Sequence, residues 1–122
     1  GLKSKWFENF TAYTIAKFGM SMCVIGMSAE YKKYNIAVNA LWPKTAIDTA
    51  AIRMLGGVVR PEQCRKVDIL ADASFFVLRR DSNKFTGKFY IDEEVLAEEG
   101  ITDLEKYSVK TGEKLFTDLY LD

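Results

Sequence analysis

The fold of this chain is decided by the stretch IAVNALWP, residues 36–43. Its first six residues, Ile36 to Leu41, form a short and nearly continuous apolar run with β-branched side chains. Such a run is typical of a strand in a parallel sheet, which is buried on both faces. We therefore expect a buried strand that ends at Trp42 and Pro43 and leads into a loop.

A long helix is expected before this strand, from Thr11 to about Lys33. Its apolar side chains recur at steps of three and four residues, the spacing of an amphipathic helix. Gly19 and Gly26 each weaken it by roughly 1 kcal/mol relative to alanine. Small residues inside a helix often permit close packing on another backbone, so we expect a tight helix–helix contact. The expected apolar face consists of Ile15, Phe18, Met22, Ile25 and Ala29.

A short helix between Ala46 and Leu55 is expected next, ended by Gly56-Gly57. Arg60-Pro61-Glu62-Gln63 then has the composition of a helix start, with proline in the first turn and an acid beside it. We expect this second long helix to reach Leu78, with a kink near Asp68. Its expected apolar face is Ile69, Leu70, Ala73, Phe76 and Val77.

The last third of the chain begins with turn residues, Asp81 to Lys84. A second strand from Phe85 to Ile91 is expected after it, followed by a charged segment, Glu93 to Tyr107, with one short helix. The tail has apolar side chains at Phe116, Leu119 and Tyr120, which indicates that it packs onto the body of the protein and is not a free linker. Two strands with three to four helices do not close an α/β domain, because a strand buried on both faces needs neighbours. The chain is therefore expected to be a fragment or one part of an assembly.

The composition excludes several functions. The 122 residues, 48% of them hydrophobic, suit one packed domain. Its 17 basic and 17 acidic residues balance, so neither nucleic acid nor an anionic membrane is an expected partner. The pairs Lys32-Lys33 and Arg79-Arg80 are expected to be solvated helix ends. No apolar stretch reaches membrane-spanning length.

Histidine is absent from the chain, and the two cysteines, Cys23 and Cys64, lie in no metal-binding motif. A zinc site, a Ser-His-Asp triad and a Cys-His pair each need an imidazole or several thiolates, so no metal is expected. Both cysteines are expected to be ordinary core or helix residues in a reducing compartment, although a disulfide between them stays open.

Tyr13 and Lys17 form the candidate catalytic pair, because residues four apart share a helix face. A free tyrosine titrates near 10, and a positive charge held beside a phenol favours the phenolate and lowers its pKa. Such a tyrosine serves as a general acid in carbonyl reduction or as a base in alcohol oxidation. With six tyrosines in the chain, a surface pair without function is the alternative.

The order of the motifs resembles the short-chain dehydrogenase/reductase family over residues 11 to about 92. The motifs in question are Tyr-x-x-x-Lys at 13–17, Val-Asn-x-x-x-Pro at 38–43, a hydrophobic-x-Thr loop at 47–49, and Thr-Gly at 86–87 before a strand and Asp92. Within the family, the stretches at 13–22, 36–47 and 63–69 are similar to the hydroxysteroid dehydrogenase-like 2 subgroup, which is associated with peroxisomes and mitochondria and carries a further sterol-carrier-like domain.

The resemblance implies the C-terminal half of a Rossmann-like doubly wound parallel sheet over residues 1–122, incomplete as given. It implies Tyr13 as the proton donor and Lys17 as the residue that lowers the pKa of Tyr13 and binds the cofactor ribose. The cofactor is NAD or NADP, which residues outside this chain decide. The loop from Pro43 to Thr49 would face the cofactor's carboxamide and phosphates. Its expected cofactor-binding residues are Pro43, Lys44, Thr45, Ile47 and Thr49.

Departures from the family pattern are Lys44 in place of a glycine, a loop one residue longer, and Asp92-Glu93-Glu94 in place of Asp-Gly-Gly. The catalytic serine and the glycine-rich dinucleotide loop of the family fall before residue 1, so the fragment alone is expected to be inactive. A small apolar alcohol or carbonyl is the expected substrate, with Met54, Leu55 and Val58 as an apolar lining or a packed lid. A homo-oligomer through the Tyr13 helix is expected. The alternative is a non-catalytic assembly subunit that keeps part of the dehydrogenase fold.

Overall fold

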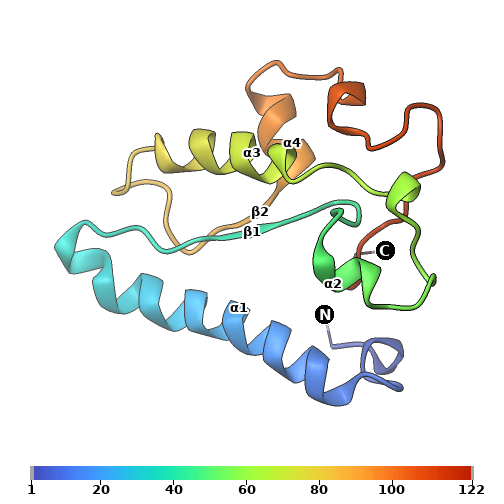
Figure 1. Ribbon diagram of the computed structural model, residues 1–122. Coiled ribbons are helices and arrows are strands. Elements are labelled where there is room, and N and C mark those ends of the chain that lie inside the picture. Colours follow the sequence, from blue (N-terminus) through green and yellow to red (C-terminus); the bar gives the residue numbers. More distant parts are fainter. Residues whose placement is uncertain (1, 122) are drawn as a thin grey trace. The chain divides into compact units, whose positions relative to one another are not determined.

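The computed structural model describes residues 2–121, and it divides into two compact units. The first unit contains the chain up to Ala40 together with Asp81–Phe89, and the second contains Leu41–Arg80 together with Tyr90–Leu121. Figure 1 shows both units as helices joined by long loops and two short strands. The α/β class is confirmed, with two parallel strands and four α-helices over the described residues.

Helix α1, Thr11–Tyr31, dominates the first unit and has the start that its spacing predicts. A 3₁₀ turn at Ser4–Trp6 precedes it, and a second one at Lys32–Tyr34 follows. Asn35 then adopts a left-handed conformation with φ of 59°, which a short amide side chain tolerates. The helical segment therefore ends close to the expected boundary near Lys33, and the first strand begins later, at Ala40.

The expected apolar face of α1 is the first departure from the prediction. Ile15, Met22 and Ile25 are about 60% exposed, each with a value of 60% or 61%. Thr14 is fully buried, and Phe18 is half-buried with its ring stacked on Phe7 at 6.2 Å. The helix thus turns a different face towards its own unit. The tight contact expected at the glycines is also absent among residues 2–121, since a Cβ at Gly19 or Gly26 would meet no atom within 4 Å.

Strands β1, Ala40–Trp42, and β2, Phe89–Ile91, pair in a two-stranded sheet. Both are shorter than expected, because side chains take over the bonding before them. The Val38 amide donates to the hydroxyl of Thr86 at 3.0 Å. The Asn39 side chain donates to the Phe85 carbonyl and accepts from the Lys88 amide, both at 2.9 Å. These contacts replace a regular ladder over the first half of each expected strand.

The second unit is built around helices α3, Asp68–Leu78, and α4, Asp92–Glu98, which pack on each other (Figure 1). Its main core is apolar and takes side chains from a loop, both helices and a 3₁₀ turn at Glu105–Tyr107. The apolar face predicted for α3 is confirmed, with Ala73 buried and Phe76 packed on the core. The buried core residues are Ile47, Ile69, Ala73, Val95, Leu96 and Tyr107.

The single helix expected between Arg60 and Leu78 is wrong. A 3₁₀ turn at Pro61–Gln63 is followed by Cys64 in extended backbone, and α3 begins only at Asp68. The reason lies in Arg65, whose backbone bridges Ile47 on one side and Ser108 on the other. Since these bridges use its amide and carbonyl, the residue is not available to a helix.

Helix α2, Ala50–Arg53, is the short helix expected after the first strand, and Gly56 and Gly57 end that region with positive φ. The tail docks as predicted, because Phe116 packs against the cluster of Ala46, Val59 and Cys64, and the ring of Tyr120 meets Trp42 edge-on at 5.8 Å.

The expectation of a solvated Arg80 is wrong. Its side chain is 14% exposed, pairs with Glu98 at 2.6 Å and covers the ring of Tyr90 at 4.8 Å. Both cysteines are free, with Cys64 buried and Cys23 exposed on α1, which confirms them as core and helix residues. No helix within residues 2–121 has the length and apolarity that crossing a bilayer requires.

Gly87 offers a test of packing in the first unit. Its φ is +69°, and a Cβ there would lie 2.9 Å from the Ser28 hydroxyl, which donates to the Ile25 carbonyl. We expect Gly87→Ala to destabilise the protein by more than the 1–2 kcal/mol of left-handed strain alone. Gly112→Ala is the matched control, because Gly112 has φ of +81° with open space around it. Denaturation of the full-length variants measures both, and equal losses would contradict the packing argument.

Candidate functional site

Tyr13 and Lys17 lie one turn apart near the start of α1. The Lys17 ammonium sits 5.5 Å from the centre of the Tyr13 ring, so both side chains lie on one face of the helix, as the spacing predicts. Tyr13 is 49% exposed, which leaves its phenol open to a partner molecule. Chemically, this arrangement presents a proton-exchanging hydroxyl with a cation next to it.

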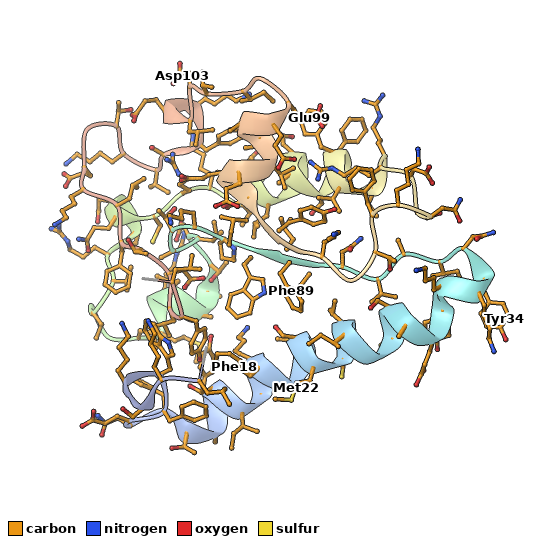
Figure 2. All side chains as sticks on the ribbon, turned by 180° about the vertical axis from the view of Figure 1, so that it is seen from behind. Phe18, Met22, Tyr34, Phe89, Glu99 and Asp103 are labelled. Atoms are coloured by element: carbon orange, nitrogen blue, oxygen red, sulfur yellow. The ribbon has the colours of Figure 1, made fainter. Side chains whose placement is uncertain are left out.

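The first turns of α1 are fixed by contacts that the sequence did not reveal. The buried Thr14 hydroxyl donates to the Trp6 carbonyl, and the Thr11 hydroxyl donates to the Phe7 carbonyl at 2.9 Å. Together with the stacked rings of Phe7 and Phe18, these bonds hold the 3₁₀ turn against the helix (Figure 2 labels Phe18). The helix segment that carries Tyr13 is therefore locally anchored on its buried side.

The loop from Pro43 to Thr49 belongs to the second unit, and its backbone is tied at alternate residues. Lys44 donates to the Asp92 carboxylate at 2.8 Å and accepts from the Asp118 amide at 3.1 Å. Ala46 donates to the Phe116 carbonyl at 2.8 Å and accepts from the Arg65 amide at 3.0 Å. These four bonds fix the path of the loop.

Thr45 and Ile47 are the residues between those anchors. Their side chains are buried, with Ile47 in the main core and the Thr45 hydroxyl without a hydrogen-bond partner among the described residues. Their amides and carbonyls make no backbone hydrogen bond within residues 2–121. The loop thus presents free backbone donors and acceptors, the groups that a primary amide pairs with. Contacts from Ile47 to a ligand would come from its backbone.

The remaining loop residues differ in exposure. Pro43 and Lys44 are half-buried, whereas Thr49 is exposed just before α2. Asp48 pairs with Arg53 at 2.8 Å, and this hydrogen bond lowers the pKa of the Asp48 carboxyl. The ion pair ties the loop to α2 on its solvent side, where an exposed pair contributes little to stability.

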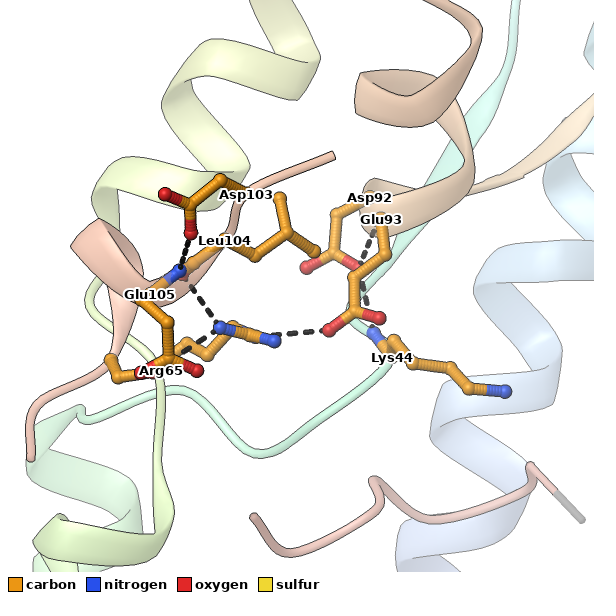
Figure 3. A network of polar contacts seen from close by, with 8 residues as sticks. Lys44, Arg65, Asp92, Glu93, Asp103, Leu104 and Glu105 are labelled. Carbon is orange, nitrogen blue, oxygen red and sulfur yellow. Dashed lines mark hydrogen bonds and ion pairs between the residues drawn. The ribbon is translucent and has the colours of Figure 1, made fainter. Parts of the chain in front are cut away.

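Arg65 is a buried cation beneath the loop (Figure 3). Its side chain is 8% exposed and donates to the Glu93 carboxylate at 2.9 Å. It also donates to the Leu104 carbonyl at 2.9 Å and to the Ser108 hydroxyl at 3.3 Å. A buried charge is tolerated only when paired and hydrogen-bonded, and these acceptors meet that need.

Asp92 lies beside this network at the start of α4 and is fully buried (Figure 3). Its Oδ1 accepts from the amides of Lys44 at 2.8 Å and Glu93 at 2.7 Å, while Oδ2 has no partner among the described residues. Burial raises the pKa of Asp92, and the two backbone bonds oppose that effect. Sequence reasoning marked this residue only as part of a motif, because its partner Lys44 is 48 positions away.

No family model matches the chain. It is 58% identical to hydroxysteroid dehydrogenase-like protein 2 of Xenopus laevis over 121 residues, which covers 99% of this chain and 28% of that protein. The human protein of the same name is 54% identical over 121 residues, again 28% of its length. The chain therefore spans little more than a quarter of these relatives.

Solved structures agree with this similarity. A protein from Xanthomonas campestris, described as a dehydrogenase, superposes with a TM-score of 0.94 at 47% identity over the whole of this chain and 44% of its own. A short chain dehydrogenase from Mycobacterium thermoresistibile gives a TM-score of 0.86 at 40% identity, over 43% of its own chain. Both likenesses cover every element described above, as part of a larger domain.

The raised pKa of Asp92 predicts a pH dependence of folding. Because burial places this pKa above its ordinary value of 3.8, the folded state binds the proton more tightly than the unfolded chain. Ionisation of Asp92 therefore costs stability, and the cost grows as pH rises from 3.8 towards the folded pKa. Glu93 adds to the shift and Arg65 opposes it.

The measurement is the free energy of unfolding of the full-length protein minus that of its Asp92→Asn variant, taken over a series of pH values. We expect this difference to fall as pH increases, because asparagine does not titrate. A difference that stays constant or increases over the series would contradict the buried, proton-retaining carboxyl.

Proposed function

Because this chain is part of a short-chain dehydrogenase/reductase domain, we propose that the whole protein interconverts an alcohol and a carbonyl with NAD or NADP. The observation that carries the proposal is the pair of Tyr13 and Lys17 on one face of an anchored helix. In this proposal the chain supplies the C-terminal half of the dehydrogenase domain, and the fragment alone is inactive.

Tyr13 is the proposed proton donor in carbonyl reduction and the proton acceptor in alcohol oxidation. Its phenol is exposed, which supports the proposed transfer of its proton to the oxygen of a bound substrate. Lys17 stabilises the negative charge that the phenol carries after it gives up the proton, and its remaining donors bind a ribose hydroxyl. The bound cofactor supplies the hydride chemistry, while the residues of the chain hold and move the proton.

The backbone groups of the loop that have no hydrogen bond match the carboxamide of a nicotinamide. A primary amide has a carbonyl acceptor and an NH₂ donor, and the unbonded amides and carbonyls of Thr45 and Ile47 complement both. The exposed Thr49 hydroxyl is proposed to bind a phosphate oxygen, with Pro43 and Lys44 lining the cofactor at the loop start. An apolar substrate is proposed because Met54, Leu55 and Val58 are 84%, 53% and 73% exposed.

Replacement of the phenol tests the proton-donor role. In the full-length protein, Tyr13→Phe is expected to reduce turnover at least about a hundredfold, because the general acid is lost. Affinity for the cofactor should stay near that of the wild type, since the Lys17 ammonium remains. Steady-state kinetics and a cofactor titration measure the two quantities.

Tyr34→Phe is the matched control. Tyr34 lies beyond the other end of α1 from Phe18 (Figure 2), is 61% exposed, and also has a lysine, Lys33, 5.0 Å from its ring centre. We expect this variant to turn over substrate at the wild-type rate. Full activity of Tyr13→Phe, or equal losses in both variants, would remove Tyr13 from the mechanism.

A self-association role is the second candidate, favoured by the exposed apolar side chains of α1. Ile15, Met22 and Ile25 form a row at helical spacing, and Gly19 and Gly26 leave open space among the described residues. We propose that a second copy of the protein packs there, so that the enzyme is a homo-oligomer through the Tyr13 helix. Such an interface is compatible with catalysis and also with a non-catalytic assembly subunit.

Ile25→Glu tests this contact. A buried, unpaired carboxylate is costly, so the full-length variant is expected to shift towards monomer. Val58→Glu is the control, because Val58 is a comparably exposed apolar residue, at 73%, outside the helix. Light scattering after size exclusion measures the masses. An unchanged mass for Ile25→Glu would place the interface elsewhere.

A further inference from the structure

Asp92 is a buried carboxylate without a cation of its own. The nearest buried cation, Arg65, gives its Nε to Glu93 and its Nη1 to Leu104 and Ser108. In Asp92, Oδ1 accepts hydrogen bonds from two backbone amides, and Oδ2 is buried without a partner among residues 2–121. Burying a carboxylate in this way is destabilising, and α4 does not use it as a cap, because the N-cap residue is Ile91.

What the buried carboxylate does is hold the backbone amide of Lys44 by a hydrogen bond. Lys44 is the first residue after Pro43, and its amide reaches Asp92 at 2.8 Å while its carbonyl accepts from Asp118 at 3.1 Å. The two bonds set the direction in which the chain leaves β1. The next anchor is Ala46, which is bonded to Phe116 and Arg65. Between these anchors, the free amide and carbonyl of Thr45 are held in one orientation.

We propose that Asp92 is a positioning residue for the nicotinamide cofactor: it fixes the Lys44 amide and thereby aims the free backbone groups of Thr45 and Ile47. This inference rests on the proposed dehydrogenase function. Asp92 does not touch the cofactor in this proposal. It acts through one hydrogen bond to the loop, and without that bond the segment between Trp42 and Ala46 loses its only side-chain anchor among the described contacts.

Two substitutions in the full-length protein separate the effect of the hydrogen bonds that Asp92 accepts from the effect of its charge. Asp92→Asn keeps an oxygen that accepts from the same amides, so we expect the dissociation constant of NADH or NADPH to stay within about threefold of the wild type. Asp92→Ala removes the acceptor, and we expect that constant to increase about tenfold, the usual effect of one lost buried hydrogen bond. Titration of cofactor fluorescence at a temperature below every variant's unfolding transition gives these constants.

Asp72→Ala is the control for stability. Asp72 accepts from the Tyr107 hydroxyl at 2.6 Å in the same unit and, among the described residues, makes no hydrogen bond to the loop. This variant should lower the unfolding temperature and leave the dissociation constant within about twofold. If Asp92→Ala does not fold, Asp92→Ser replaces it, since serine keeps a polar side chain but is too short to hold both amides. We expect the same tenfold weakening from serine.

The outcomes distinguish the two proposals. Equal constants for the asparagine and alanine (or serine) variants, or an equal weakening in Asp72→Ala, would overturn the positioning role while the dehydrogenase function stands. A wild-type protein that binds neither NADH nor NADPH would overturn both. Weakening confined to the variants without an acceptor supports the positioning role.

Discussion

The buried guanidinium of Arg65 is the constraint on which the second unit depends. An unpaired charge at 8% exposure would be strongly destabilising, and the Glu93 carboxylate, the Leu104 carbonyl and the Ser108 hydroxyl together satisfy it. Meeting that requirement draws the start of α4 and the segment near Ser108 to one point (Figure 3). The Arg65 backbone adds the bridge to Ile47, so one residue connects the loop of residues 43–49 to both.

This arrangement explains which elements could be predicted from the sequence. Helix α1 and the apolar face of α3 follow from local periodicity, and they begin or pack as expected. The stretch between Pro61 and Asp68 does not, because its conformation is set by bonds to residues far away in the chain. Ala46 and Tyr107 bond the amides of Arg65 and Lys66. Local helix preference is worth a few tenths of a kcal/mol per residue, whereas each buried backbone group left unpaired costs about 1–3 kcal/mol, so the long-range bonds decide.

The exposed face of α1 shows a second limit of sequence patterns. Periodicity predicts that Ile15, Met22 and Ile25 pack against something, and it does not say whether that surface lies within these 122 residues. The residues that α1 does bury in its own unit, Thr14 and Phe18, include a polar one with a specific acceptor, the Trp6 carbonyl. A hydrophobic pattern counts only apolar residues, so it does not identify a threonine that is buried because it is hydrogen-bonded. The orientation of the helix about its own axis could therefore not be predicted.

The candidate site is predictable to the extent that its geometry is local. Tyr13 and Lys17 are four residues apart in a regular helix, so spacing alone places them together, but an ammonium also lies near the rings of Tyr34 and Tyr107. Proximity therefore does not distinguish a catalytic tyrosine. The Tyr107 hydroxyl donates a hydrogen bond to the Asp72 carboxylate, and burial raises the pKa of Tyr107, which makes it a poorer acid. Tyr34 lies in a 3₁₀ turn beyond α1, where no buried residue anchors the turn. Tyr13 combines an exposed phenol with an anchored helix, and the proposed proton transfer needs both, because a general acid must be held within hydrogen-bond reach of the oxygen it protonates.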